Sequence, residues 1–147
     1  TQEALESAVA GVASVNCKLK PILLGVTVLT TINNEECNSI YGSDVKTKVQ
    51  QFAGLAAQAG LDGVVCSAEE ASLLRTNSHT SDLILVTPGI RPTWAVSNDQ
   101  KRVVTPSDAV RNGVDYLVIG RPITNPPAEV GSPHEAVERI VQEIKEM

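Results

Sequence analysis

Aromatic side chains are scarce in this 147-residue sequence, in which one tryptophan, two tyrosines and one phenylalanine make up 3% of the residues. Aliphatic side chains must therefore build the core, since hydrophobic residues still account for 42% of the chain. Surfaces that bind single-stranded nucleic acid stack the bases on aromatic rings. The shortage of such rings argues against a surface of that kind.

Positive charge is also in short supply. Twelve Lys and Arg residues stand against 17 Asp and Glu residues, which gives a net charge of −5, and the basic residues form no dense cluster. Because nucleic acids and anionic membranes attract basic surfaces, neither is expected as the main partner. No apolar stretch approaches the length of a transmembrane helix, and the first residues do not resemble a signal peptide, so we expect a cytoplasmic protein.

Cysteine is rare, and the three residues Cys17, Cys37 and Cys66 share no metal-ligand spacing. Their odd number argues against a disulfide framework, so reduced thiols in the cytosol are the expected state. Cys66 ends an apolar run, and we therefore predict that this side chain is simply buried.

Four short apolar runs predict buried strands. They lie at residues 21–30, 63–67, 83–86 and 116–119. Apolar residues at helical spacing, together with capping residues, predict the helices that separate them. The helices are expected at residues 2–15, 44–59 (capped by Ser43), 68–75 (capped by Ser67), 106–113 (capped by Thr105) and 133–146. The segments 33–42, 93–102 and 122–133 are expected as loops, the first with room for a short helix.

Strands that alternate with helices predict a parallel sheet with right-handed crossovers. Two phrases, residues 59–65 and 112–118, repeat this pattern, because in each a helix ends on Gly and a strand begins just after Asp. Polar residues follow every predicted strand at its carboxyl end, an arrangement more typical of a (β/α)8 barrel than of an open sheet. They are Thr30 with Thr31, Ser67, Arg91 and Arg121. A whole barrel takes about 250 residues, so we predict an α/β fold that forms half of a TIM barrel.

The last predicted strand ends directly in Gly120-Arg121-Pro122. Glycine lets a ligand approach the backbone closely, and the planar guanidinium of arginine suits phosphate or carboxylate. This pair therefore indicates an anion site at the end of the strand. The simpler interpretation is an ordinary strand end with a surface arginine.

Five blocks of the sequence resemble orotidine-5′-monophosphate decarboxylases of the bacterial type. The blocks are VTVLT (26–30), GLDGVVCSAEEA (60–71), LVTPGIRP (85–92), DQKR (99–102) with VTPSDAV (104–110), and GVDYLVIGRPIT (113–124). The resemblance covers nearly the whole chain and matches the second half of that enzyme, which implies strands five to eight of the barrel with their helices. It also implies a homodimer that converts orotidine 5′-monophosphate (OMP) to UMP and CO2 without a metal or organic cofactor.

The resemblance implies roles for five residues. Thr30 would contact the pyrimidine, and four others would bind the nucleotide, chiefly its phosphate: Arg91, Gln100, Gly120 and Arg121. Gln100 lies in the loop 93–102, which is expected to close over bound ligand. Phosphate binding far from the reacting base can drive such a closure.

The catalytic motif of the resembling family, Asp-x-Lys-x-x-Asp at the end of a barrel strand, is missing from this sequence. The nearest match is Asp44-Val-Lys46, but position 49 is Val and the stretch opens a predicted helix. Geometry decides whether an acid or base can act, so we predict that Asp44 and Lys46 are not catalytic. The chain is expected to carry the residues that bind the nucleotide and to be inactive alone.

Three functional hypotheses follow. The chain is the C-terminal half of an OMP decarboxylase, with the N-terminal half or another copy of the chain as partner. Alternatively, it is a half-barrel that binds nucleotide monophosphates without turnover, since a lone four-stranded sheet exposes both edges. The third hypothesis keeps the barrel but changes the substrate to another sugar phosphate, because fold alone does not decide function.

Overall fold

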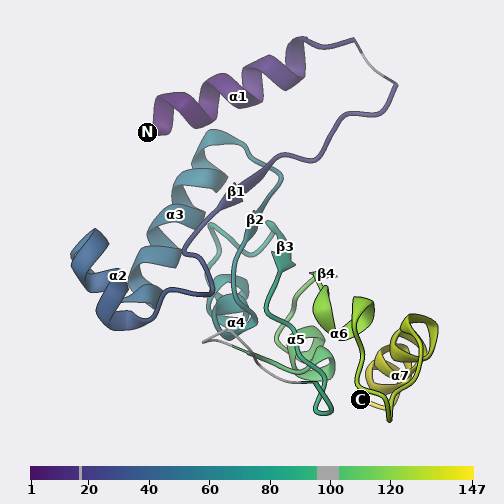
Figure 1. Ribbon diagram of the computed structural model, residues 1–147. Helices are drawn as coiled ribbons and strands as arrows, with labels where there is room; N and C mark the ends of the chain where they lie inside the picture. The colour runs from purple at the N-terminus through teal and green to yellow at the C-terminus, as the bar shows by residue number, and fades with distance from the viewer. Residues whose placement is uncertain (17, 96–102) are drawn as a thin grey trace.

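The computed structural model describes residues 1–16, 18–95 and 103–147, so the predicted ligand Gln100 and Cys17 lie outside the described residues. The chain forms helices and strands in alternation along most of its length (Figure 1). In order they are α1 (Gln2–Ser14), β1 (Leu24–Val26), α2 (Asn34–Tyr41), α3 (Val45–Ala59), β2 (Gly63–Val65), α4 (Ala68–Thr76), β3 (Ile84–Thr87), α5 (Pro106–Arg111), β4 (Tyr116–Leu117), α6 (Arg121–Thr124) and α7 (Pro133–Lys145).

The four strands form one parallel sheet in the order β1-β2-β3-β4, which confirms the predicted α/β fold. Sequential strands are spatial neighbours, as expected when a helix crosses over between each pair. Three of the four strands are shorter than the apolar runs that predicted them, most of all β1, which is only Leu24–Val26 of the run 21–30. Strand β3 is as long as its run 83–86 but lies one residue later.

The two faces of the sheet differ sharply in burial. On one face Val64 and Leu85 are paired neighbours with no exposed surface, and they pack into the core with apolar residues of α3 and α4. On the other face, the row Val26–Val65–Val86–Tyr116 runs straight across all four strands. Val26 keeps 62% of its surface exposed and Tyr116 keeps 55%.

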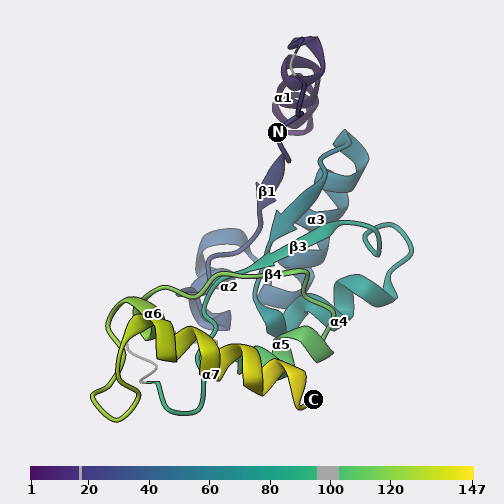
Figure 2. The ribbon, with the colours of Figure 1, turned by 90° about the vertical axis from the view of Figure 1, so that its right-hand side faces the viewer.

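The prediction that residues 116–119 form a fully buried strand is therefore wrong for this chain. Tyr116 and Val118 are 55% and 49% exposed. A parallel strand is buried on both sides only when both faces of its sheet are covered. Figures 1 and 2 show α3, α4 and α5 together on one side of the strands, the covered face.

Helix starts agree with the sequence at most positions. Ser67 and Glu70 form a capping box at the start of α4, and Thr105 caps α5 through a bond from Asp108 N–H. The predicted cap Ser43 is wrong, because its neighbour Asp44 accepts the bond from Thr47 N–H (3.0 Å) and so caps α3. Both residue types are good caps, and because the helix begins at Val45 the flanking position belongs to Asp44.

Two short helices occupy segments predicted mainly as loops. Asn33 and Glu36 close a capping box that begins α2, which ends where Gly42 adopts a left-handed conformation with φ of 68°. The second helix, α6, follows Gly120 directly and ends at Thr124. The sequence signal for α2 was the Asn-x-x-Glu spacing that defines a capping box.

Candidate functional site

The carboxyl ends of the four parallel strands lie along one edge of the sheet, since all strands run in the same direction. The predicted polar residues follow these ends. Thr30 comes after β1, Ser67 after β2, Arg91 after β3 and Gly120 after β4. Ser67 is occupied as the cap of α4, as its position predicts, which leaves the other three as candidates for ligand contact.

Thr30 lies in a pocket of about 240 Å³ at this edge and is only 7% exposed. The pocket is built from the ends of three strands and is mostly aliphatic. Its lining consists of Val26, Val28, Leu29, Thr30, Thr31, Val65, Cys66 and Pro88. A concave, largely apolar site with a few hydroxyl groups is the usual form of a small-molecule site. Cys66 is buried here, as predicted, and therefore lies beside the candidate ligand pocket.

Arg91 is held firmly at the end of β3. Its backbone N–H donates to Val104 O (3.0 Å), its Nη1 donates to Ile90 O (2.8 Å), and the residue is only 8% exposed. Ile90 and Val104 form an isolated parallel bridge, so the two ends of the intervening segment lie side by side. Burial of a guanidinium group costs free energy unless its N–H groups form hydrogen bonds. A buried arginine at this edge is therefore a candidate for binding an anionic ligand.

Gly120 presents an open backbone surface. A Cβ built on it would have no described atom within 4 Å. Its carbonyl accepts from Ile123 N–H (2.9 Å) and Thr124 N–H (3.0 Å) and so takes part in the first turn of α6. The space next to its Cα is open. Arg121, the first residue of α6, is exposed. This geometry allows close approach of a ligand, as the sequence predicts.

The structure brings these residues to one edge of the sheet, and the pocket around Thr30 includes only part of the set. Thr30 shares its pocket with Pro88, three residues before Arg91, whereas Arg91, Gly120 and Arg121 lie outside the lining of that pocket. A ligand that contacted all of them would have to extend along the edge from β1 to β4. The sequence prediction for Gln100 concerns a position outside the described residues.

Asp44 has a structural role. Besides capping α3, its carboxylate accepts from Thr47 Oγ1 (2.7 Å). The Thr47 backbone N–H, followed by the Thr47 hydroxyl, lowers the pKa of this carboxyl below its ordinary value. The stretch Asp44-Val-Lys46 thus opens a helix, as predicted, and does not reproduce a catalytic group at a strand end.

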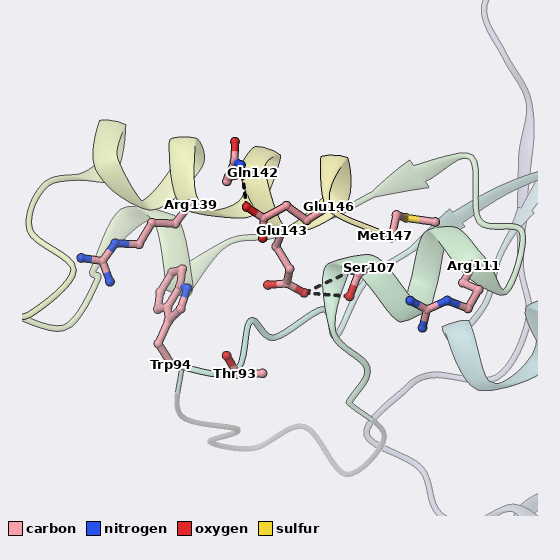
Figure 3. Close-up of a pocket in the computed structure, with 9 residues that line it drawn as sticks. All are labelled: Thr93, Trp94, Ser107, Arg111, Arg139, Gln142, Glu143, Glu146 and Met147. Atoms are coloured by element: carbon pink, nitrogen blue, oxygen red, sulfur yellow. Dashed lines mark hydrogen bonds between the residues drawn. The ribbon is translucent and has the colours of Figure 1, made fainter.

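Sequence analysis missed two features near this region. Thr87, the last residue of β3, is fully buried, and its Oγ1 has no hydrogen-bond partner among the described residues. A threonine directly before Pro88, at the end of an apolar run, was the available signal. The second feature is a surface groove of about 420 Å³ between α5 and α7, lined by Trp94, Ser107 and Glu143 among others (Figure 3).

Metal ligation and membrane crossing find no support in the described ranges. No group of three or more His, Cys, Asp or Glu side chains there could hold a metal ion. In the same part of the chain, no helix has both the length and the apolar character needed to cross a membrane.

Comparison with known proteins gives a family match over residues 2–140, to the family described as Orotidine 5'-phosphate decarboxylase / HUMPS family. The chain belongs to this family. The orotidine 5'-phosphate decarboxylase of Geobacter sp. (strain M21) is 45% identical over 145 residues, which cover 98% of this chain and 56% of that protein. The protein of the same name from Coxiella burnetii (strain RSA 331 / Henzerling II) is 45% identical over 142 residues, or 96% of this chain and 58% of the relative.

Solved structures of the decarboxylase family share the fold. Orotidine 5'-phosphate decarboxylase from Lactobacillus acidophilus superposes with a TM-score of 0.74 at 31% identity, covering 98% of this chain and 59% of that one. The enzyme from Sulfolobus solfataricus, at 20% identity and a TM-score of 0.55 over 84% of this chain and 48% of that one, supports the fold alone. This family member spans little more than half the length of the curated relatives it matches.

Proposed function

We propose that this chain is the nucleotide-binding half of an orotidine-5′-monophosphate decarboxylase, which converts OMP to UMP and CO2. The family membership supports the reaction class. One observation carries the assignment to this chain: Thr30, the buried Arg91 and the open Gly120 follow three strands at the same edge of one parallel sheet. Carboxyl ends of parallel strands are where barrel enzymes bind their ligands.

The proposed ligand extends along that edge. Its pyrimidine would occupy the pocket beside Thr30, where aliphatic walls and a hydroxyl suit a flat polar ring. Its phosphate would lie near Arg91, Gly120 and Arg121. Arginine forms two parallel charge-assisted bonds with phosphate oxygens, and a glycine without a side chain lets these oxygens approach the backbone. Gln100 would add a further contact from its own segment.

We further propose that the four strands are strands five to eight of a (β/α)8 barrel. The apolar row Val26–Val65–Val86–Tyr116 on the uncovered face supports this, because barrel interiors are packed with apolar side chains. Val26 at one end of the row and Tyr116 at the other would then contact the remaining four strands. The partner in this arrangement is the N-terminal half of the barrel, and the assembled enzyme would be a cytoplasmic homodimer.

Decarboxylation needs groups that this chain does not carry. The bond from C6 to the carboxylate breaks, the electron pair stays at C6, and a proton must be delivered there. A positioned acid has to stand within hydrogen-bond reach of that carbon. Thr30, Arg91 and Arg121 can orient the nucleotide, whereas the lysine and carboxylates of the reaction would come from the N-terminal half.

Reconstitution tests this proposal. The chain is mixed with a separately produced N-terminal half from the Geobacter relative, and loss of OMP is followed with UMP and CO2 as products. We expect each part to be inactive alone and the mixture to be active. Failure of the mixture, together with equal affinity of this chain for UMP and uridine, would reject the assignment.

A second candidate function is nucleotide binding without turnover. The absence of an Asp-x-Lys-x-x-Asp sequence from the chain favours it. Under this hypothesis UMP binds, but the reconstituted mixture releases no CO2. Turnover of a different sugar phosphate in the same mixture would instead favour a related decarboxylase.

A further inference from the structure

A hydrogen-bonded clamp joins the last helix to α5. Glu143 of α7 accepts two bonds from one residue: Ser107 N–H donates to its Oε1 at 3.3 Å and Ser107 Oγ at 3.1 Å. The two residues are 36 positions apart in the sequence. Figure 3 shows the Glu143 carboxylate pointing from α7 across the groove to the start of α5.

Ser107 stands close to the backbone that holds Arg91. The residue is the second of α5, and Thr105, the cap of this helix, directly follows Val104. Val104 O accepts the bond from Arg91 N–H (3.0 Å). A continuous path of covalent and hydrogen bonds therefore runs from Glu143 through Ser107 and Val104 to the Arg91 backbone.

The same helix also contacts the other proposed phosphate residue. Helix α7 packs against both α5 and α6, and α6 begins with Arg121. Its own position is fixed, since Ala136 and Ile140 are buried and Ser132 closes a capping box with Glu135. Helix α7 is thus a shared support for the two elements that carry Arg91 and Arg121.

We propose that Glu143 is a positioning residue for phosphate binding, an inference that rests on the proposed function. By fixing Ser107 to α7, it sets the distance between the Arg91 strand end and the Arg121 helix. Two arginines can bind one phosphate only when their spacing matches it, because misplacement of about 1 Å is enough to weaken a preorganised site. Glu143 itself does not touch the ligand.

Three variants of α7 separate this role from a general effect of the helix. Glu143→Ala removes the acceptor, and Glu143→Gln keeps a carbonyl oxygen that can accept from Ser107. Glu138→Ala is the matched control, since Glu138 is an exposed residue of the same helix and lies 3.4 Å from His134 on its own helix. Each variant is measured in two ways, by amide hydrogen exchange and by affinity for UMP and for uridine.

Hydrogen exchange at the Arg91 amide tests the clamp without any ligand. We expect faster exchange at this amide in Glu143→Ala, and wild-type exchange in Glu143→Gln and Glu138→Ala. The Leu85 amide, which donates to Asp115 in the sheet, should keep its protection in all three variants. Unchanged exchange at Arg91 in Glu143→Ala overturns the inference, and so does equal acceleration at Leu85, because it would show general destabilisation.

Ligand affinity tests the consequence for phosphate. We expect Glu143→Ala to weaken UMP binding by roughly 5-fold while uridine affinity is unchanged, which is less than the loss of a whole hydrogen bond to a charged group, because the arginines are displaced and not removed. An equal loss for both ligands, or no loss for UMP, contradicts the positioning role. If the wild-type chain binds UMP no better than uridine, the proposed function fails, and the exchange experiment still decides whether the clamp exists.

Discussion

Arg75 and Asp115 form an ion pair that joins α4 to the start of β4. The same Asp115 Oδ2 accepts a bond from Leu85 N–H of β3 at 2.7 Å. Arg75 in turn donates to three backbone carbonyls, those of Gly113, Ser81 and Leu83. This network lies at the amino ends of the strands, opposite the proposed ligand edge, where barrel residues serve stability.

Arg75→Ala should lower the free energy of unfolding by about 2–3 kcal/mol, since it leaves several partly buried acceptors without their donor. Arg111→Ala is a matched control, because Arg111 is 60% exposed and pairs with Asp108 on its own helix. Removal of such a surface pair should change stability by less than about 0.5 kcal/mol. The urea concentration at the midpoint of unfolding measures both changes in stability, provided that the dependence of the unfolding free energy on urea is the same in each variant. Equal losses in Arg75→Ala and Arg111→Ala would contradict the structural role of Arg75.

Substitution of two glycines separates an effect on the stability of the fold from an effect on ligand binding. In Gly63→Ala the new Cβ would lie 2.2 Å from Ile84 O, a backbone atom of the next strand, so we expect a loss of roughly 3 kcal/mol or more of stability. In Gly120→Ala the new Cβ meets no described atom within 4 Å. This variant should stay within about 1 kcal/mol of wild type.

Gly120→Ala, which should stay folded, is tested by its affinity for UMP. Because the Cβ of Gly120→Ala enters the space proposed for phosphate, UMP affinity should fall about 10-fold, with uridine affinity unchanged. Thermal unfolding and titration calorimetry on the same preparation provide the measurements. A stable Gly120→Ala variant with wild-type UMP affinity would show that no ligand approaches this position.

Acid stability should depend on the cap of α3. The pKa of Asp44 in the folded state lies below its ordinary value of 3.8, chiefly because Thr47 N–H bonds to the carboxylate. A lowered folded pKa means that the stabilisation is fully present above about pH 4 and is lost as the pH falls through the folded value. Asp44→Asn keeps a capping oxygen but removes the titration, so its stability should fall less steeply below about pH 4.

The same variant tests the rejected catalytic motif. Asp44→Asn should leave UMP affinity unchanged, because Asp44 caps a helix and lies outside the lining of the Thr30 pocket. Denaturant unfolding at several pH values and a UMP titration at neutral pH give the two results. Loss of UMP binding in this variant would show that Asp44 takes part in ligand binding.

Much of the fold could be predicted because local signals agreed with it. Apolar runs separated by helical patterns predicted the parallel sheet, and the repeated Asp that precedes two of its strands, Asp62 or Asp115, links the start of its strand to the neighbouring segment. Asp62 does so by accepting from Leu23 N–H at 2.7 Å. These signals lie within a few residues of the feature they predict, so a single sequence is enough to read them.

Other features depend on contacts between distant segments. The exposure of Tyr116 follows from an uncovered sheet face, which no local pattern of apolar residues records. The Glu143–Ser107 clamp and the Arg75 network join residues 36 and about 40 positions apart, so sequence spacing gave no sign of either. The anion site at Gly120 and Arg121 was predicted from the strand end itself, and the roles of Thr30, Arg91 and Gln100 came from the resemblance; all of them stay predictions.

Phosphate is proposed to bind where Arg91 and Arg121 follow their strands. Titration of the chain with UMP and with uridine tests this most directly. The wild-type chain should bind UMP more tightly than uridine. Arg121→Ala should remove roughly 10- to 100-fold of UMP affinity and leave uridine affinity unchanged, as expected for loss of a charged hydrogen bond. Equal UMP affinity in wild type and Arg121→Ala would contradict the account.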